Sequence, residues 1–169
     1  MAADEPRGDV KRLRAPSERV SPRARLMWIA TDALRGIVVM VFLLFATGPW
    51  NWFDLPGWVL WVIGALLLAY AALVPQWRYL VHRWEVTDAA VYTQTGWWAR
   101  ERRIAPMSRV QTVDHREGAI SRLFGLSTVR VTTASSAGAL TIEGLDRDRA
   151  LGIVDDLTRM ADSIPGDAT

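Results

Sequence analysis

The feature that most constrains this chain is a stretch of 42 consecutive residues, 36–77, that contains no lysine or arginine. Only Gly48-Pro49 and residues 54–57, which read DLPG, interrupt its apolar sequence. A helix needs about 20 mainly apolar residues to cross roughly 30 Å of hydrocarbon, and each half of the stretch approaches that length. The sequence therefore predicts a transmembrane hairpin with spans over about residues 26–47 and 57–74.

Aromatic residues mark the two boundaries of the predicted spans. Tryptophan gathers at membrane interfaces because its ring is apolar and its N–H group is polar. Three tryptophans fall at the turn of the hairpin and two at its open end: Trp50, Trp52, Trp58, Trp28 and Trp77. We therefore expect all five to anchor the hairpin at the level of the lipid headgroups.

Two charges and several small residues lie inside the predicted hairpin. Asp32 and Arg35 are three residues apart in the first span, so they share a helix face and can form an ion pair. Small residues recur at helical spacing in the second span: Gly64, Ala65, Ala69 and Ala72. They let another helix approach closely, either the other helix of the hairpin or a helix of a partner subunit.

The remainder of the 169 residues has room for one compact domain. Residues 1–25 combine prolines with charges of both signs and lack an apolar period, which predicts a disordered basic tail. We expect the domain over residues 78–162 and a short tail over residues 163–169. Cysteine is absent, which excludes disulfides, thiolate metal sites and cysteine nucleophiles.

The charge distribution predicts an orientation and argues against a nucleic-acid partner. Residues 1–35 contain eight basic and five acidic residues, whereas residues 78–169 contain twelve arginines and twelve acids. Basic flanks remain in the cytoplasm, so both termini are expected on the cytoplasmic side of the inner cell membrane. Because a nucleic-acid-binding domain carries a basic footprint and this domain is neutral, we expect no DNA or RNA partner.

From residue 78 onward, short alternating segments replace the long apolar runs, as in antiparallel β structure. Strands are predicted at residues 79–86, 90–95, 97–104, 109–114, 128–133 and 139–142. The last segment is predicted to be an amphipathic helix that Asp146 can cap and that Pro165-Gly166 ends. The fold class is therefore an α+β membrane protein, in which a helical hairpin precedes a small antiparallel β barrel or sandwich capped by a C-terminal helix.

Four segments of the domain resemble those of a known family. They read RWEVTD at residues 83–88, IAPMSRVQTV at 104–113, ISRLFGL at 120–126 and VRVTTA at 129–134. With the hairpin before them, residues 26 to about 160 resemble the bacterial pleckstrin-homology-like membrane proteins. The resemblance implies two nearly orthogonal antiparallel sheets closed by a C-terminal helix. It also implies a protein partner, because relatives often occur as a short protein beside a larger one with several such domains.

Two interpretations of these segments stay open. In the structural one, Pro106 ends a strand, Val110 and Val113 supply core contacts, and Gly125 allows the turn into the next strand. In the functional one, a polar site for a headgroup or a peptide is built from Arg100, Arg102, Arg103, Arg109, Gln111 and Arg122.

The arginine cluster does not match the phosphoinositide site of better known pleckstrin-homology domains. Strand alternation puts Arg100 and Arg102 on one face and Arg103 on the other, so only two of the three share a ligand easily. The familiar site uses basic residues around the first hairpin, whereas residues 86–90 here read VTDAA, with an acid and no base.

No catalytic or metal-binding constellation emerges from the residues. The two histidines, His82 and His115, lie 33 residues apart and outside any metal-ligand spacing. We therefore expect no enzymatic activity, no cofactor and no metal. We interpret the chain as a membrane-anchored module that binds a protein partner, such as a larger relative. Sensing of a lipid headgroup or a small ligand is the alternative.

Overall fold

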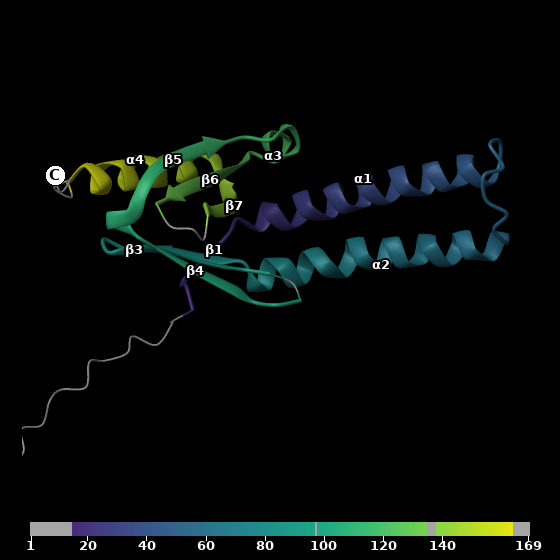
Figure 1. Cartoon of the computed structure of the whole chain (residues 1–169), viewed down its shortest axis with the longest axis horizontal. Helices are drawn as coiled ribbons and strands as arrows, with labels where there is room; N and C mark the ends of the chain where they lie inside the picture. The colour runs from purple at the N-terminus through teal and green to yellow at the C-terminus, as the bar shows by residue number, and fades with distance from the viewer. Residues whose placement is uncertain (1–14, 97, 135–137, 164–169) are drawn as a thin grey trace, which may run out of the picture.

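A helical hairpin extends from one end of a β-rich domain (Figure 1). The structure is a computed structural model that describes residues 15–96, 98–134 and 138–163. In chain order, its elements are β1 (Glu18–Arg19), α1 (Pro22–Thr47), α2 (Gly57–Val81), β2 (Arg83–Val86), β3 (Ala90–Thr95), β4 (Glu101–Pro106), the 3₁₀ helix η1 (Met107–Arg109), β5 (Val110–Arg116), α3 (Ala119–Leu123), β6 (Leu126–Thr133), β7 (Leu140–Asp146) and α4 (Arg147–Ser163).

The hairpin has the length and surface of a membrane-embedded pair of helices. At about 1.5 Å per residue, the 26 residues of α1 and the 25 residues of α2 are each long enough to cross the hydrocarbon layer. Only 6% of the most apolar 18-residue segment of each helix is buried within the protein, whereas the core helices of soluble domains are mostly buried. This arrangement confirms the predicted helical hairpin.

Small residues bring the two helices of the hairpin together. A β-carbon added at Gly64 would lie 3.1 Å from the Met40 Cε atom, and one added at Gly36 would lie 3.6 Å from the Leu67 Cβ atom. The other small residues of the predicted set, Ala65, Ala69 and Ala72, are exposed on the outside of the hairpin. The hairpin therefore packs on itself through Gly64.

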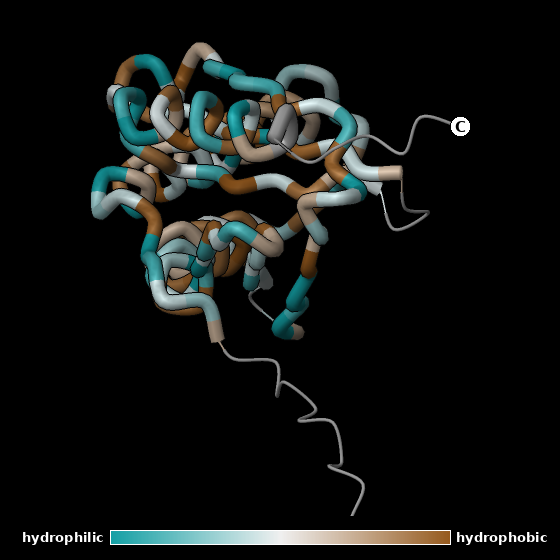
Figure 2. The backbone as a smooth tube through the Cα atoms, turned by 90° about the vertical axis from the view of Figure 1, so that its left-hand side faces the viewer, coloured by the Kyte–Doolittle hydropathy of each residue, from teal (hydrophilic) through white to brown (hydrophobic). Residues whose placement is uncertain are grey.

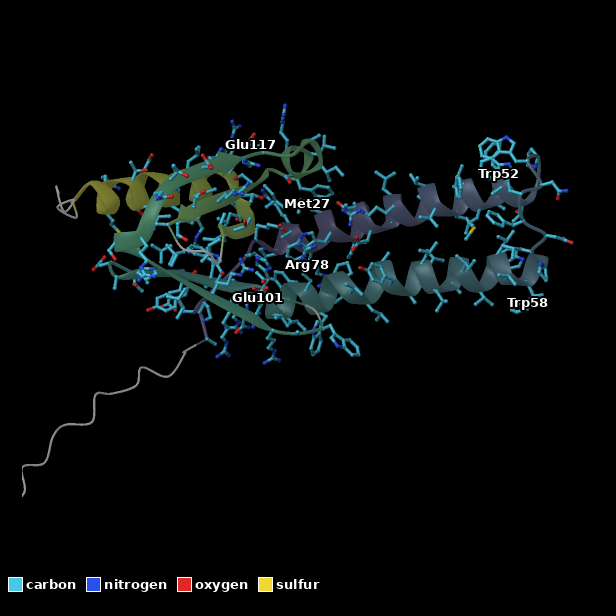
Figure 3. The ribbon with its side chains drawn as sticks, in the orientation of Figure 1. Met27, Trp52, Trp58, Arg78, Glu101 and Glu117 are labelled. Carbon is cyan, nitrogen blue, oxygen red and sulfur yellow. The ribbon has the colours of Figure 1, made fainter. Side chains whose placement is uncertain are left out.

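Aromatic rings cluster at the tip of the hairpin. The rings of Trp50 and Trp52 stack with centroids 4.8 Å apart, and the Phe45 ring lies 5.9 Å from that of Trp50. Trp52 and Trp58 both lie at this end, far from the domain (Figure 3). At the opposite end, the prediction for Trp28 is wrong, because this side chain is only 4% exposed and belongs to the domain core.

The domain consists of two antiparallel sheets and a helix that covers them. In the described part of the chain, one sheet has the strand order β1-β2-β3-β4 and the other the order β5-β6-β7. α4 packs against β5, β6 and β7, and buries Ala150, Ile153 and Leu157. Viewed from the domain end, hydrophilic segments (teal) lie mainly at the periphery, around a hydrophobic interior (brown, Figure 2). This is the pleckstrin-homology-like fold that the resemblance implies.

The start of α1 is docked onto the edge of β7. Ser21 caps the helix by accepting a hydrogen bond from the Arg23 backbone N–H, and Pro22 occupies the first turn, where its missing N–H costs nothing. The Ser21 N–H donates to the Gly144 carbonyl at 2.9 Å, and the Ser21 hydroxyl donates to the Asp146 carboxylate at 2.9 Å. The first turn of α1 is therefore fixed to β7 of the second sheet.

The first turns of α1 are part of the domain core, which corrects two expectations. Val20, Ala24, Met27 and Trp28 pack with the buried residues of both sheets. The tail predicted to be disordered over residues 1–25 instead forms β1 and the start of α1 within residues 18–25, while residues 1–14 lie outside the described residues. The compact domain also begins before residue 78, because a segment that precedes the hairpin in sequence completes its core.

α2 continues beyond its predicted end at Val74. Pro75 lies inside the helix and is fully buried, and the helix reaches Val81. An internal proline costs about 3 kcal/mol because it removes a hydrogen bond and crowds the preceding turn. The turns after it offset that cost: Val81 is buried, and Arg78 binds the domain. The strand predicted at residues 79–86 is therefore wrong in its first half.

The other predicted strands overlap observed ones. Residues 90–95, 109–114, 128–133 and 139–142 correspond to β3, β5, β6 and β7, and residues 97–104 to β4, which begins at Glu101. Trp97 lies outside the described residues, as do the Pro165-Gly166 end of the last helix and the tail after residue 163. β4 ends at Pro106, and Val110 and Val113 pack against the core, which confirms these contacts of the structural interpretation.

Gly144 offers a direct test of the docking of α1. It has a φ of +75°, and an added β-carbon would lie 2.6 Å from the Ala24 Cβ atom, which cannot rotate away. Gly138 has a similar φ of +80° but faces open space. Both alanine variants incur left-handed strain of about 1–2 kcal/mol. We expect Gly144→Ala to lose about 1–3 kcal/mol more stability than Gly138→Ala, the cost of overpacking. Unfolding of the full chain in detergent measures the difference, and equal losses contradict the docking.

Candidate functional site

A polar cavity lies at the junction between the hairpin and the domain. Its volume is about 420 Å³, within the range of small-molecule sites. Its walls come from the middle of α1, from the second half of α2, from the paired strands β3 and β4, and from β7. Arg78 of α2 and Glu101 of β4 both lie where the hairpin meets the domain (Figure 3). We call this space the junction cavity.

Three arginine–carboxylate pairs line the junction cavity among the described residues. An Asp32 carboxylate oxygen accepts from Arg35 Nη1 at 3.2 Å, which confirms the pair predicted from their spacing. The two other pairs join Arg78 to Glu143 at 2.7 Å and Arg103 to Glu101 at 2.6 Å. The pairs balance one another in charge, so the cavity as a whole is neutral but strongly polar.

Arg78 also links the hairpin to the domain through an aromatic ring. Its guanidinium carbon lies 4.3 Å from the centroid of the buried Trp28 ring, while its Nη2 atom donates to Glu143 of β7. Cation–π contacts of partly desolvated arginines contribute about 1 kcal/mol or more. The same side chain therefore joins α2, α1 and the second sheet at the cavity wall.

His82 is a buried histidine at the end of α2 that lines the junction cavity. It is 4% exposed, and its ring lies 5.7 Å from that of Trp28 at a tilted angle. Burial, and then the positive charge of Arg78, lower the pKa of His82 from 6.5 to about 4. Its Nδ1 atom has no hydrogen-bond partner among the described residues. At neutral pH this site therefore presents an uncharged imidazole.

A second cavity of about 270 Å³ contains three of the six predicted site residues. Arg102, Arg103 and Arg109 line this basic groove together with residues of β6 and β7. Arg103 lines the junction cavity as well. The other three, Arg100, Gln111 and Arg122, are exposed and are not among the residues that line either cavity. Arg100 precedes β4, so strand alternation does not relate it to Arg102 as expected.

The match to known families fits this geometry. The family model described as "Bacterial PH domain" matches residues 33–161, which include most of the hairpin and nearly the whole domain. The chain belongs to the bacterial PH domain family. It is also 26% identical over 152 residues to the UPF0699 transmembrane protein YdbS of Bacillus subtilis (strain 168), covering 86% of this chain and 93% of that protein. No solved structure matches the chain.

The first hairpin of this bacterial PH domain has no cationic side chain at its turn. Between β2 and β3, the Thr87 hydroxyl accepts a hydrogen bond from the Ala90 N–H, and Asp88 is exposed. The arginines that line the junction cavity and the basic groove belong instead to α1, α2, β4 and η1. No group of three or more histidine, cysteine, aspartate or glutamate side chains suited to a metal ion occurs within residues 15–96, 98–134 and 138–163.

Sequence reasoning missed the junction cavity of the bacterial PH domain. Asp32 and Arg35 were predicted only to form an ion pair, and His82 was not assigned to any site. The only local signal was three polar residues close to an apolar span: Asp32, Arg35 and Arg78. The partner of Arg78 across the cavity, Glu143, belongs to β7, a strand that no sequence period connects to the hairpin.

The lowered pKa of His82 predicts an acid-sensitive stability. This histidine is protonated near pH 6.5 in the unfolded chain but only near pH 4 in the folded protein. Between these pH values the folded state therefore binds fewer protons than the unfolded state. The stabilising contribution is present above pH 6.5 and is lost as the pH falls toward 4, by up to about 3 kcal/mol.

Comparison of His82→Gln with the parent chain isolates this contribution from the titration of carboxylates. We expect the stability difference between the two proteins to shrink by up to about 3 kcal/mol on acidification from pH 7 to pH 4. Chemical unfolding in detergent at several pH values measures it, with His115→Gln as the histidine control. A difference that does not change with pH contradicts the burial of a neutral His82.

Proposed function

We propose that this bacterial PH domain protein is a non-catalytic, membrane-anchored interaction module that binds a protein partner at the cytoplasmic face of the inner membrane. Both helices cross the membrane, so that the N- and C-termini lie in the cytoplasm. The basic flanks of the hairpin and its connection, which carries Asp54 as its single charge, support this orientation. The resemblance favours a larger relative of the same family as the partner.

The observation that carries the proposal is the open edge of β4. Within the described residues this strand pairs only with β3. The Met107 N–H donates to the Ala89 carbonyl, and antiparallel pairs alternate, so the N–H groups of Arg102 and Ile104 point away from β3. An extended segment of a partner can add to such an edge through backbone hydrogen bonds.

The side chains around this edge favour an acidic partner segment. Ile104 is 42% exposed at the middle of β4 and offers an apolar contact. Arg102 and Arg109 line the basic groove beside it. Arginines on an edge strand also discourage pairing with random strands, so a specific partner has to match their charge. We therefore expect an extended segment with acidic side chains.

A proline at position 104 tests strand addition. Proline is tolerated on an edge strand where its missing N–H faces outward, so Ile104→Pro should keep the fold while removing a donor to the partner. Ile104→Thr, the matched control, changes the side chain but keeps the N–H and the β-branched shape. We expect about a tenfold loss of the copurifying partner for the proline variant and little loss for the threonine variant.

The measurement is quantitative mass spectrometry of proteins crosslinked to the tagged full chain in its own membrane and extracted gently. Circular dichroism of both variants verifies folding. A chain that remains monomeric and recovers no partner contradicts the proposed function. A partner that Ile104→Pro retains as well as the parent chain contradicts strand addition at β4.

A further inference from the structure

We propose that the junction cavity binds the headgroup of a membrane lipid that carries both a phosphate and an ammonium group, as phosphoethanolamine does. The proposal does not depend on the protein partner, which is assigned to the outer edge of β4. It rests on the depth of the cavity relative to the hairpin, on the balance of its charges and on an unsatisfied polar group in its wall.

The depth of the cavity matches the headgroup layer. Asp32 and Arg35 lie near the middle of α1, and the next 42 residues contain no basic residue. Tyr70 and Val74 of α2 line the same cavity just before the first basic residue after the hairpin, Arg78. A tyrosine and arginines at the end of an apolar span are typical of the membrane interface. A lipid headgroup beside the hairpin therefore lies at the level of the cavity.

The rim of the domain supports this depth. Leu123, 84% exposed, ends α3, which contacts α1. Trp98, 88% exposed, lies in the connection between β3 and β4. Gly96 of the same connection lines the junction cavity. Figure 1 shows α3 and this connection at the hairpin end of the domain, on opposite sides of the helices. Exposed apolar side chains there suit the boundary between headgroups and acyl chains.

The charge balance of the cavity selects a ligand with both signs. Each of the three arginines already has a carboxylate partner, so a purely anionic ligand would leave carboxylates without their cations. A phosphate that binds the guanidinium groups, with an ammonium that binds the displaced carboxylates, preserves every pairing. A headgroup that carries both groups therefore satisfies the site better than a phosphate alone.

His82 adds an unsatisfied polar group to the wall of the cavity. Its side chain is nine-tenths or more buried and lines the cavity, and its Nδ1 atom has no hydrogen-bond partner among the described residues. Buried polar atoms are nearly always hydrogen-bonded in folded proteins. Two threonines, Thr93 and Thr141, add hydroxyl groups to the same wall. The two hydroxyl groups suit the phosphate ester and glycerol oxygens of a lipid.

Native mass spectrometry of the full chain tests the proposal. The protein is equilibrated with equal amounts of phosphatidylethanolamine and phosphatidylglycerol in detergent, and the lipid retained per chain is counted. We expect one phosphatidylethanolamine to be retained in preference to phosphatidylglycerol, because only the former carries the ammonium group.

Two variants of partly exposed side chains probe each half of the ligand without disturbing the core. Glu101→Gln removes a carboxylate, and should lower the preference for phosphatidylethanolamine about tenfold, the factor that one charge-assisted hydrogen bond is worth. Arg35→Gln removes a cation and should weaken the retention of both lipids. Asp156→Asn, in an exposed ion pair on α4, removes a carboxylate away from the cavity and serves as the control.

Three results would overturn the headgroup site. The parent chain retains both lipids equally, it prefers phosphatidylglycerol, or the retained lipid is unchanged in both Glu101→Gln and Arg35→Gln. A fourth arm separates a lipid from a free compound. If soluble glycerophosphoethanolamine stabilises the lipid-free protein as strongly as the lipid does, the cavity belongs to a soluble ligand and the lipid assignment is wrong.

Discussion

The packing of the Trp28 ring at the base of the hairpin is the interaction on which the rest of the structure depends. Trp28 belongs to α1, yet it is buried in the domain, with Arg78 at its face and His82 beside it. A buried tryptophan contributes several kcal/mol, a large share of the stability of a domain of this size. Because its neighbours belong to the end of α2, both helices of the hairpin are joined to the same core.

Because of this junction, the hairpin fixes the position of the domain as well as anchoring it. A flexible tether would only keep the domain near the bilayer, whereas α1 and α2 here enter the domain without a linker. The domain is therefore held at one height and one orientation. Such a fixed placement keeps the junction cavity at a constant depth relative to the bilayer. It also keeps the edge of β4 facing in one direction. Both proposed activities, headgroup binding and strand addition, require this constraint.

Much of the fold follows from periodicity. The stretch without lysine or arginine predicted the hairpin, and alternation together with turn residues located both ends of β3, because these signals are local. The junction is not local. Ser21 and Asp146 are 125 residues apart, and Arg78 and Glu143 are 65 apart, so no spacing rule connects them. The end of α2 and the position of Trp28 were mispredicted for the same reason: tertiary packing outweighs the usual preference of proline, here Pro75, for helix ends and of tryptophan for interfaces.

The distance distribution between two spin labels tests the rigid junction most directly, and the absence of native cysteines allows labels at chosen positions. Cysteines that replace Asp155 on α4 and Leu66 on α2 lie on exposed faces of the domain and of the hairpin. In lipid nanodiscs, pulsed electron resonance should give a single narrow distance distribution. A broad distribution, as expected for a domain on a flexible tether, would contradict the account.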